Sequence, residues 1–258
     1  MKNKRGKSVM VFSPKGGVGK TVISASLAGA AFLRSKKVLL LDLDIFNGGL
    51  SVFINKDINK TIFHLLDDLN NSRYNNFSDY IYKYNDNIDV LVAPKDPRQG
   101  SKLNGKYIDR IIDRFLNDYD LVIVDGLSIL NDFNILTMDC VNNILFIITN
   151  DMICLKNTKN ILNIFKDNNI TNYKILYNNS FELKNNYFTF HDIGKIIDNN
   201  IDYMLDKNSL FSNITSYMYE GKIPYTFSSS MKNKELLTVL NKFLDDVFNK
   251  GDENNEEK

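Results

Sequence analysis

The residues best suited to chemistry lie in a glycine-rich segment near the N-terminus, Ser13-Pro14-Lys15-Gly16-Gly17-Val18-Gly19-Lys20-Thr21. Its glycines let successive backbone N–H groups turn inward as a nest for an anion, and a helix beginning at Lys20 adds the positive end of its dipole. We predict that Lys20 bridges the β- and γ-phosphates of a nucleotide and that the Thr21 hydroxyl binds Mg²⁺. The residues of the predicted phosphate cradle are Gly16, Gly17, Val18, Gly19, Lys20, Thr21 and Val22.

Carboxylates follow two of the apolar runs that we predict to be strands. Asp42 and Asp44 lie two residues apart at the end of Val38–Leu43, so strand alternation would place both on the same side. Asp125 ends the apolar run Leu121–Asp125. Because ligands bind at the carboxyl ends of parallel strands, we expect these three side chains to face the phosphates.

Short apolar runs alternate along the chain with segments of helical periodicity. The predicted strands are Ser8–Phe12, Val38–Leu43, Ile88–Ala93, Leu121–Asp125, Ile144–Thr149 and Tyr173–Tyr177. The predicted helices are Lys20–Arg34, Thr61–Leu69, Lys106–Leu116, Leu155–Phe165, Ser209–Tyr219 and Glu235–Phe248, with Asn70 to Asn87 a loop that contains a short helix. Nearly continuous apolar strands separated by helices indicate an α/β fold, doubly wound, with a mostly parallel sheet covered by helices on both faces. We expect one domain over residues 1–250 and an acidic, disordered tail at 251–258.

Composition excludes several other classes of protein. The 258 residues are 43% apolar, which excludes bulk disorder, and the net charge of +1 gives no strong field for nucleic acid or an anionic membrane. Cys140 and Cys154 cannot form a disulfide framework or a four-thiolate metal site, and His64 and His191 are isolated. No segment is long and apolar enough for a signal peptide or a membrane span, so we expect a soluble, cytoplasmic protein.

The phosphate loop departs from the usual pattern G-x-x-x-x-G-K-[ST] at Pro14 and matches the variant K-G-G-x-G-K-[ST]. In this it resembles the MinD/ParA-type P-loop ATPases, of the SIMIBI class of P-loop proteins, whose mark is the extra lysine, here Lys15. In that family this lysine reaches the phosphates bound by the other subunit of a dimer, as an arginine finger does. The resemblance implies a slow, Mg²⁺-dependent ATPase with ATP and Mg²⁺ as cofactors, an ATP-dependent homodimer, and Lys15 and Lys20 as catalytic residues.

The same resemblance assigns roles outside the loop. Asp44 would hold the attacking water as a third catalytic residue, and Asp42 and Asp125 would support Mg²⁺ together with Thr21. Asn178, at the end of the strand Tyr173–Tyr177, would read the adenine base.

Two departures from the family pattern bear on the hydrolysis rate. Val22 stands where the family has threonine or serine, so one hydroxyl contact to the α-phosphate is missing. Gly126-Leu127-Ser128 follows Asp125 where the family often has proline and glycine, so the second switch is unusual. We expect both to leave nucleotide binding intact.

Weaker features are similar to the CpaE/TadZ branch, which positions pilus-assembly machinery. They are Asp42–Gly48, which looks like its first switch, Val90–Pro97, like its mid-domain loop, and Ile201–Pro224, like its last strand and helix. The predicted function is an ATP-dependent switch that positions a cellular machine (pilus, flagellum or division apparatus) through an unidentified protein partner at the membrane or pole. The insert Ser180–Asn200 is the first candidate for the partner surface.

Two alternatives remain open. A ParA-like, DNA-partitioning ATPase would need a basic surface; the first 37 residues carry nine Lys and Arg and no acid, although two of these lysines belong to the phosphate loop. A nearly inert ATP-binding scaffold would follow from Val22 and the altered second switch. Direct membrane attachment is not expected, because the apolar stripe of Glu235–Phe248 has a nearly neutral polar face and an acidic tail follows it.

Overall fold

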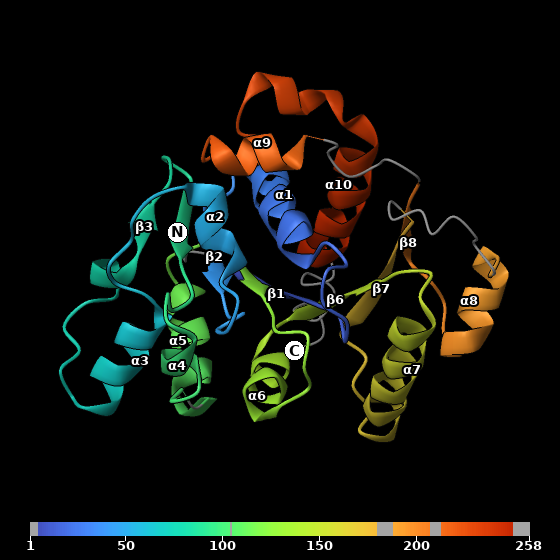
Figure 1. Cartoon of the computed structure of the whole chain (residues 1–258), viewed down its shortest axis with the longest axis horizontal. Coiled ribbons are helices and arrows are strands. Elements are labelled where there is room, and N and C mark those ends of the chain that lie inside the picture. Colours follow the sequence, from blue (N-terminus) through green and yellow to red (C-terminus); the bar gives the residue numbers. More distant parts are fainter. Residues whose placement is uncertain (1–4, 104, 180–187, 207–212, 250–258) are drawn as a thin grey trace, which may run out of the picture.

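The sheet that positions the site is built from the short apolar runs of the sequence (Figure 1). The computed structural model describes residues 5–103, 105–179, 188–206 and 213–249. The predicted tail 251–258, residues 180–187 of the predicted partner insert and the start of the predicted helix Ser209–Tyr219 lie outside the described residues. The strands of the described part are β1 (Lys7–Phe12), β2 (Val38–Asp42), β3 (Tyr82–Lys83), β4 (Ile88–Leu91), β5 (Leu121–Asp125), β6 (Asn143–Ile148), β7 (Tyr173–Asn178) and β8 (Tyr203–Leu205).

These strands form one sheet in the order β3-β4-β2-β5-β1-β6-β7-β8. Neighbours pair in parallel except for β3 and β4, which are antiparallel. β1 lies between β5 and β6, so the chain first builds one side of the sheet and then the other, and the crevice of a doubly wound fold opens at the carboxyl end of β1. The predicted α/β, mostly parallel architecture is confirmed.

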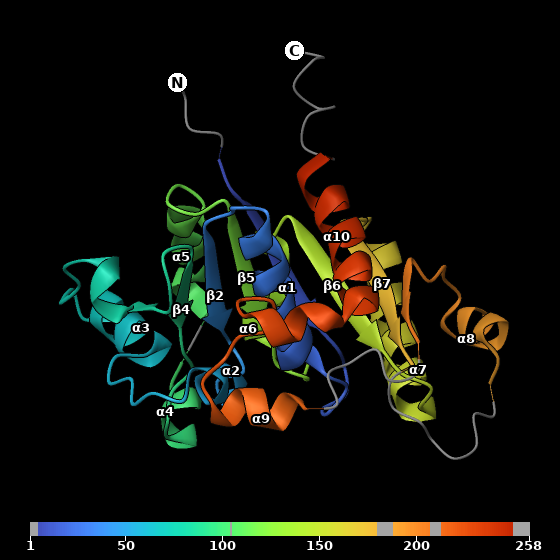
Figure 2. The same cartoon turned by 90° about the horizontal axis from the view of Figure 1, so that it is seen from above.

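Helices cover both faces of the sheet (Figures 1 and 2). Alternate residues of β1 enter the two cores, Val9 and Val11 on one face and Met10 and Phe12 on the other. The helices whose residues enter the core of Val9 are α1 (Lys20–Leu33), α2 (Gly49–Ile54), α9 (Ile214–Tyr219) and α10 (Lys234–Asn249). Those entering the core of Met10 are α3 (Ile62–Asn70), α5 (Ile108–Phe115), α6 (Asp132–Cys140), α7 (Met152–Asp167) and α8 (Phe190–Ile197).

Several elements differ from the sequence prediction. The segment predicted as a loop with a short helix contains a 3₁₀ turn, Phe77–Tyr80, and the edge strand β3. Helices α2, α6, α8 and the one-turn α4 (Pro97–Gly100) were not predicted. The C-terminal helix packs as predicted, because Leu236, Leu240, Phe243, Leu244 and Val247 are buried in the core. No helix among the described residues is long and apolar enough to cross a bilayer.

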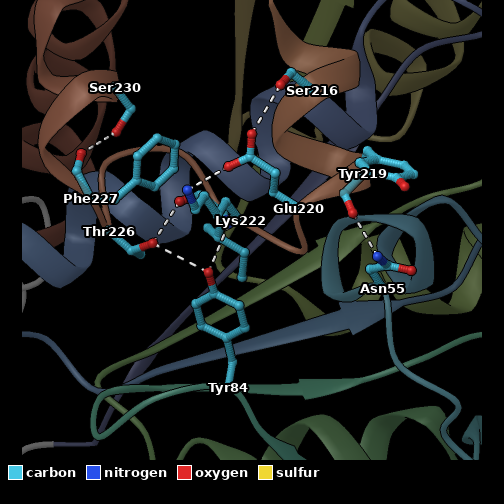
Figure 3. Close-up of polar contacts among 10 residues, drawn as sticks. Asn55, Tyr84, Ser216, Tyr219, Glu220, Lys222, Thr226, Phe227 and Ser230 are labelled. Atoms are coloured by element: carbon cyan, nitrogen blue, oxygen red, sulfur yellow. Dashed lines mark hydrogen bonds and ion pairs between the residues drawn. The ribbon is translucent and has the colours of Figure 1, made fainter.

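The C-terminal part of the chain fastens α2, which follows the predicted first switch (Figure 3). The side-chain amide of Asn55 donates to the Tyr219 carbonyl oxygen at 2.6 Å, and α2 and α9 are in contact. Below them, the Tyr84 hydroxyl accepts from the Ile223 backbone N–H at 2.9 Å and lies 3.3 Å from the Thr226 hydroxyl. The carboxyl end of α2 is therefore anchored to the end of α9, and the segment that follows α9 is held by Tyr84.

Candidate nucleotide-binding site

The glycine-rich segment connects β1 to α1 and has the backbone of an anion nest. Gly17 has φ +75° and Gly19 has φ +94°, conformations that L-residues with a side chain rarely adopt. Gly19 is the N-cap of α1 and has no side chain to occupy the helix N-terminus, so the first N–H groups of the helix remain open to an anion. The segment predicted to be a phosphate cradle is therefore a loop that ends at a helix N-terminus without a side-chain cap.

Asp125 lies against this loop, although 104 residues separate it from Thr21. The Thr21 hydroxyl donates to one carboxylate oxygen at 2.6 Å and the Ser24 hydroxyl donates to the other at 3.0 Å. Burial raises the pKa of Asp125 from 3.8 to about 6, against the hydrogen bond from Thr21 and the charge of Lys20, which lower it. Ser24 was not assigned a role from the sequence. It lies three residues after Thr21 in α1, so both hydroxyls lie on the same face of the helix.

Asp42 is fully buried and is held by backbone donors. The N–H of Asp44 donates to one of its oxygens at 3.1 Å and the N–H of Leu50 donates to the other at 2.9 Å. Burial, followed by the charge of Asp125, raises the pKa of Asp42 well above its ordinary value. The Leu50 contact fixes the beginning of α2 at the site, so Asp42 joins the end of β2 to that helix.

Asp44 reaches the same site by a route that strand alternation did not predict. β2 ends at Asp42, and Asp44 begins the turn that follows, where one carboxylate oxygen accepts from the Asn47 side chain at 2.9 Å. Its charge acts on both Lys20 and Asp42, which places the three predicted carboxylates in one group. The three carboxylates lie near one another, and the alternation argument for Asp44 is wrong because β2 ends two residues before it.

The Lys20 side chain is almost fully buried beside this group. Burial lowers its pKa, while the charges of Asp125 and Asp44 raise it. Its ammonium donates to the Ser128 hydroxyl at 2.5 Å, a residue of the altered second switch to which the sequence assigned no contact. The ammonium therefore points into the site.

The Lys15 side chain pairs with a carboxylate of the segment that follows β6. Its ammonium lies 2.8 Å from a carboxylate oxygen of Asp151, and 37% of its side chain is exposed. The ion pair with Lys15 lowers the pKa of Asp151, which also caps α7 by accepting from the Cys154 N–H at 2.9 Å. Asp151 was missed from the sequence; the available signal is that it lies three residues after β6, beyond the carboxyl end of a strand as Asp44 does.

Two predicted binding residues, Asn178 and Val22, have other contacts within the protein. The Asn178 side-chain amide donates to the Val18 carbonyl oxygen at 2.9 Å and so ties the end of β7 to the phosphate loop. Val22 packs against the apolar core around α1 and offers no hydroxyl. The adenine-reading role of Asn178 stays a prediction.

The donor set fits a magnesium ion held together with phosphates. Thr21, Asp42 and Asp125 supply a hydroxyl and two carboxylates, the oxygen ligands that Mg²⁺ prefers, and the two buried carboxylates have raised pKa values that a cation would reverse. In the described part of the chain no group of three or more His, Cys, Asp or Glu could hold a metal by itself. Mg²⁺ usually keeps several waters and binds through one or two carboxylates plus substrate phosphates, which matches this set.

The residues excluded as ligands have ordinary structural places. The His64 ring nitrogen accepts from the Thr61 N–H at 3.2 Å and caps α3. Cys140 and Cys154 are free thiols, and Cys154 is buried.

Comparisons with known proteins agree with this geometry. The sequence profile of the family described as an AAA domain matches residues 6–183. An uncharacterized ATP-binding protein of Methanocaldococcus jannaschii is 30% identical over 144 residues, 56% of this chain and 53% of that protein, so the chain spans about half the length of this relative.

Two solved structures share the fold. The septum site-determining protein MinD of Pyrococcus horikoshii, complexed with Mg-ADP, superposes with a TM-score of 0.75 at 18% identity, over 92% of this chain and 96% of that one. A ParA family ATPase of Chlorobium tepidum superposes with a TM-score of 0.76 at 16% identity, over 92% and 98%. The family match covers more than half of the chain and includes the phosphate loop with the additional Lys15. The protein therefore belongs to the MinD/ParA-type P-loop ATPases.

Proposed function

We propose that this protein is a switch that dimerises when it binds ATP, hydrolyses the ATP slowly, and positions a larger cellular assembly. One observation carries the proposal: Lys15 belongs to the phosphate loop, yet its ammonium is held by Asp151 outside the cradle. A cation on a partly exposed side chain at the edge of the site can reach the phosphates of a second protomer. There it would stabilise charge in the transition state as an arginine finger does.

Exposed apolar side chains around the same edge support a homodimer. Phe46, Ile129, Met152 and Ile153 follow the carboxyl ends of β2, β5 and β6, and Ile153 is 65% exposed. Apolar side chains grouped around a charged site favour burial against a partner surface. A second copy of this chain, facing the first across the nucleotides, would bury them.

The chain's own residues divide the chemistry. Mg²⁺ supplies positive charge to the phosphate oxygens when it is bound. Lys20 provides a second positive charge from within the protomer, and Lys15 would provide the third from the partner. Asp44, half-buried in the turn after β2, would orient the attacking water. Val22 leaves the α-phosphate one contact short, in keeping with slow turnover.

Sizing the protein with ADP, with ATP, and as Asp44→Ala with ATP tests the switch. Loss of the water-orienting carboxylate should trap the ATP state, so we expect a dimer for Asp44→Ala with ATP and a monomer with ADP. Lys15→Ala is the matched control, because it keeps the cradle and removes the cation offered to the partner. A monomeric Asp44→Ala protein at saturating ATP would overturn the dimer.

The nearly inert scaffold is tested by phosphate release. We expect a slow, Mg²⁺-dependent rate that Asp44→Ala abolishes. A wild-type rate no higher than that of Asp44→Ala would favour the scaffold.

Attachment to DNA is less well supported than attachment to a protein. Two of the basic residues before residue 38 are neutralised within the fold, since Arg5 pairs with Asp113 and Arg34 pairs with Asp245. We therefore propose a protein partner at the membrane or pole, with the CpaE/TadZ type of function as the first candidate. Retention on non-specific DNA at low salt with ATP would favour the partitioning alternative instead.

A further inference from the structure

The second switch of this chain has an unusual serine, Ser128, and that serine reaches over the phosphate loop. Its hydroxyl accepts from the Lys20 ammonium at 2.5 Å. It also faces the beginning of the loop, where a Cβ built on Gly16 would lie 4.0 Å from the Ser128 oxygen. The lysine of a phosphate loop reaches the β- and γ-phosphates. The Ser128 hydroxyl, bonded to this ammonium, therefore lies close to where those phosphates would bind.

A buried asparagine holds this serine in position. The side-chain amide of Asn134, in α6, donates to the carbonyl oxygens of Leu127 at 3.1 Å and of Ile129 at 2.5 Å, the residues on either side of Ser128. The backbone on both sides of the serine is therefore fixed to one side chain.

The Asn134 side chain is buried with one polar atom unpaired within the described part of the chain. Asn134 is fully buried, and its side-chain oxygen has no hydrogen-bond partner among the described residues. Burying an unsatisfied acceptor is unfavourable, and the two hydrogen bonds that the same side chain donates to the backbone offset this cost. The two bonds that fix the switch are what this asparagine provides.

We propose that the Ser128 hydroxyl is a γ-phosphate contact of this ATPase and that Asn134 is the positioning residue that holds it there. A serine hydroxyl accepts and donates at once, so it can keep its bond from Lys20 while it donates its own proton to a phosphate oxygen. In the described part of the chain that proton has no acceptor at hydrogen-bond distance. ADP has no γ-phosphate, so the contact distinguishes ATP from ADP.

The inference rests on the ATP binding proposed above and is tested by binding, without turnover. Dissociation constants for Mg-ADP and for the non-hydrolysable analogue Mg-AMPPNP are measured by calorimetry. Ser128→Ala should weaken AMPPNP binding by about tenfold, the value of a hydrogen bond to a charged group, and change ADP binding by less than about twofold. Ser128→Thr keeps the hydroxyl and should restore the preference.

Two further variants separate positioning from mere stability. Asn134→Ala should reduce the ratio of the two affinities as Ser128→Ala does, whereas a merely structural role would weaken both nucleotides equally. Ser216→Ala is the matched control, because this serine is exposed and donates to Glu220 at 3.1 Å on α9 (Figure 3). It should change neither constant. Repeating the series in Lys15→Ala protein removes any contribution from dimerisation.

The outcomes distinguish the two proposals. If the wild-type protein binds neither nucleotide, the proposed function fails. If it binds both and Ser128→Ala leaves their ratio unchanged, the serine contact alone is refuted. Should Asn134→Ala fail to fold, the half-buried Ser128 remains testable by its own two variants.

Discussion

The buried carboxylate of Asp125 should make the nucleotide-free protein less stable above pH 6 than an uncharged variant. Its pKa is raised to about 6 from 3.8, mainly by burial. A raised pKa in the folded state means that the native protein binds the proton more tightly than the unfolded chain does. The free energy of unfolding therefore falls as the pH rises from about 4 to about 6, and the full cost, about 3 kcal/mol, is present above that range.

Asp125→Asn should recover most of this free energy. Asparagine has one acceptor oxygen instead of two, but both donors to Asp125 are hydroxyls, from Thr21 and Ser24, which can turn and accept instead. Allowing about 1 kcal/mol for the poorer hydrogen bonds, we expect the variant to be more stable by about 2 kcal/mol at pH 8. The gain should shrink toward pH 4, where the folded protein keeps the proton and the carboxyl of the unfolded chain, with a pKa of 3.8, is also becoming protonated.

Asp42→Asn is the matched comparison, and it should behave differently. Its two donors are the backbone N–H groups of Asp44 and Leu50, which cannot turn, so one of them would face the amide N–H of the new side chain. That unsatisfied donor costs about 1–3 kcal/mol and offsets the removal of charge. We expect no gain in stability for this variant at any pH, although burial raises the pKa of Asp42 as well.

Urea unfolding followed by far-ultraviolet circular dichroism measures these differences, since the chain has no tryptophan. It is carried out at pH 4.5, 6 and 8 with EDTA and without nucleotide, and repeated with Mg-ADP. Asp125→Asn should lose the Mg²⁺-dependent part of the stabilisation that the wild-type protein gains from the ligand. A gain that is equal at pH 4.5 and pH 8, or a loss of stability at pH 8, would refute the reasoning.

Three further predictions concern other parts of the chain. Asp151→Asn keeps the cap of α7 but releases Lys15, so the ATP-dependent dimer should form at a concentration about two- to fivefold lower, the value of an exposed ion pair; unchanged sedimentation would show that the pair does not compete with the partner. Val22→Thr supplies the missing hydroxyl and should tighten ADP binding by about tenfold in calorimetry, and an unaltered constant would show that the side chain does not face the α-phosphate. Gly221→Ala should lower the free energy of unfolding by about 2 kcal/mol or more, because φ is +68° and the Cβ would lie 2.7 Å from a carbonyl oxygen at the end of α2. Gly194→Ala, inside α8 with ordinary contacts, is the control and should be neutral or stabilising. Equal effects of the two substitutions in thermal unfolding would contradict this reasoning.

The parts of the site that could be predicted from sequence are those coded by neighbouring residues. The phosphate loop needs a strand, three glycines and a helix in immediate succession, and Asp125 needs only an apolar strand that ends in a carboxylate. The order of these elements then brings them together, because parallel strands present their carboxyl ends at one edge.

What could not be predicted depends on contacts between distant residues. α2 has six residues, begins at a glycine and shows no helical periodicity; it is fixed by the Leu50 N–H on Asp42 at one end and by Asn55 on Tyr219 at the other. The partner of Lys15 lies 136 positions along the chain, between the predicted strand Ile144–Thr149 and the predicted helix Leu155–Phe165, where no element was predicted. β3 is too short for its alternation to be recognised and is held by its pairing with β4.

The side chains that the proposed function assigns to the nucleotide also form hydrogen bonds and ion pairs within the protein. Lys20 donates to Ser128, Thr21 donates to Asp125, and Lys15 pairs with Asp151. Each of these bonds uses a group that the proposed function assigns to a phosphate, to Mg²⁺ or to the partner's nucleotide. Binding must therefore exchange internal bonds for bonds to the ligand, which lowers the net affinity.

The internal bonds also lie beside the exposed apolar side chains. Ser128 lies in the segment that bears the exposed Ile129, and Asp151 directly precedes the exposed Met152 and Ile153, so the groups released by the ligand adjoin the apolar surface available to a second copy. A site whose internal bonds ran only into the core would bind ATP without altering that surface. Because these bonds instead end in the loops that carry the surface, the proposed function predicts that occupation of the site and dimerisation are linked.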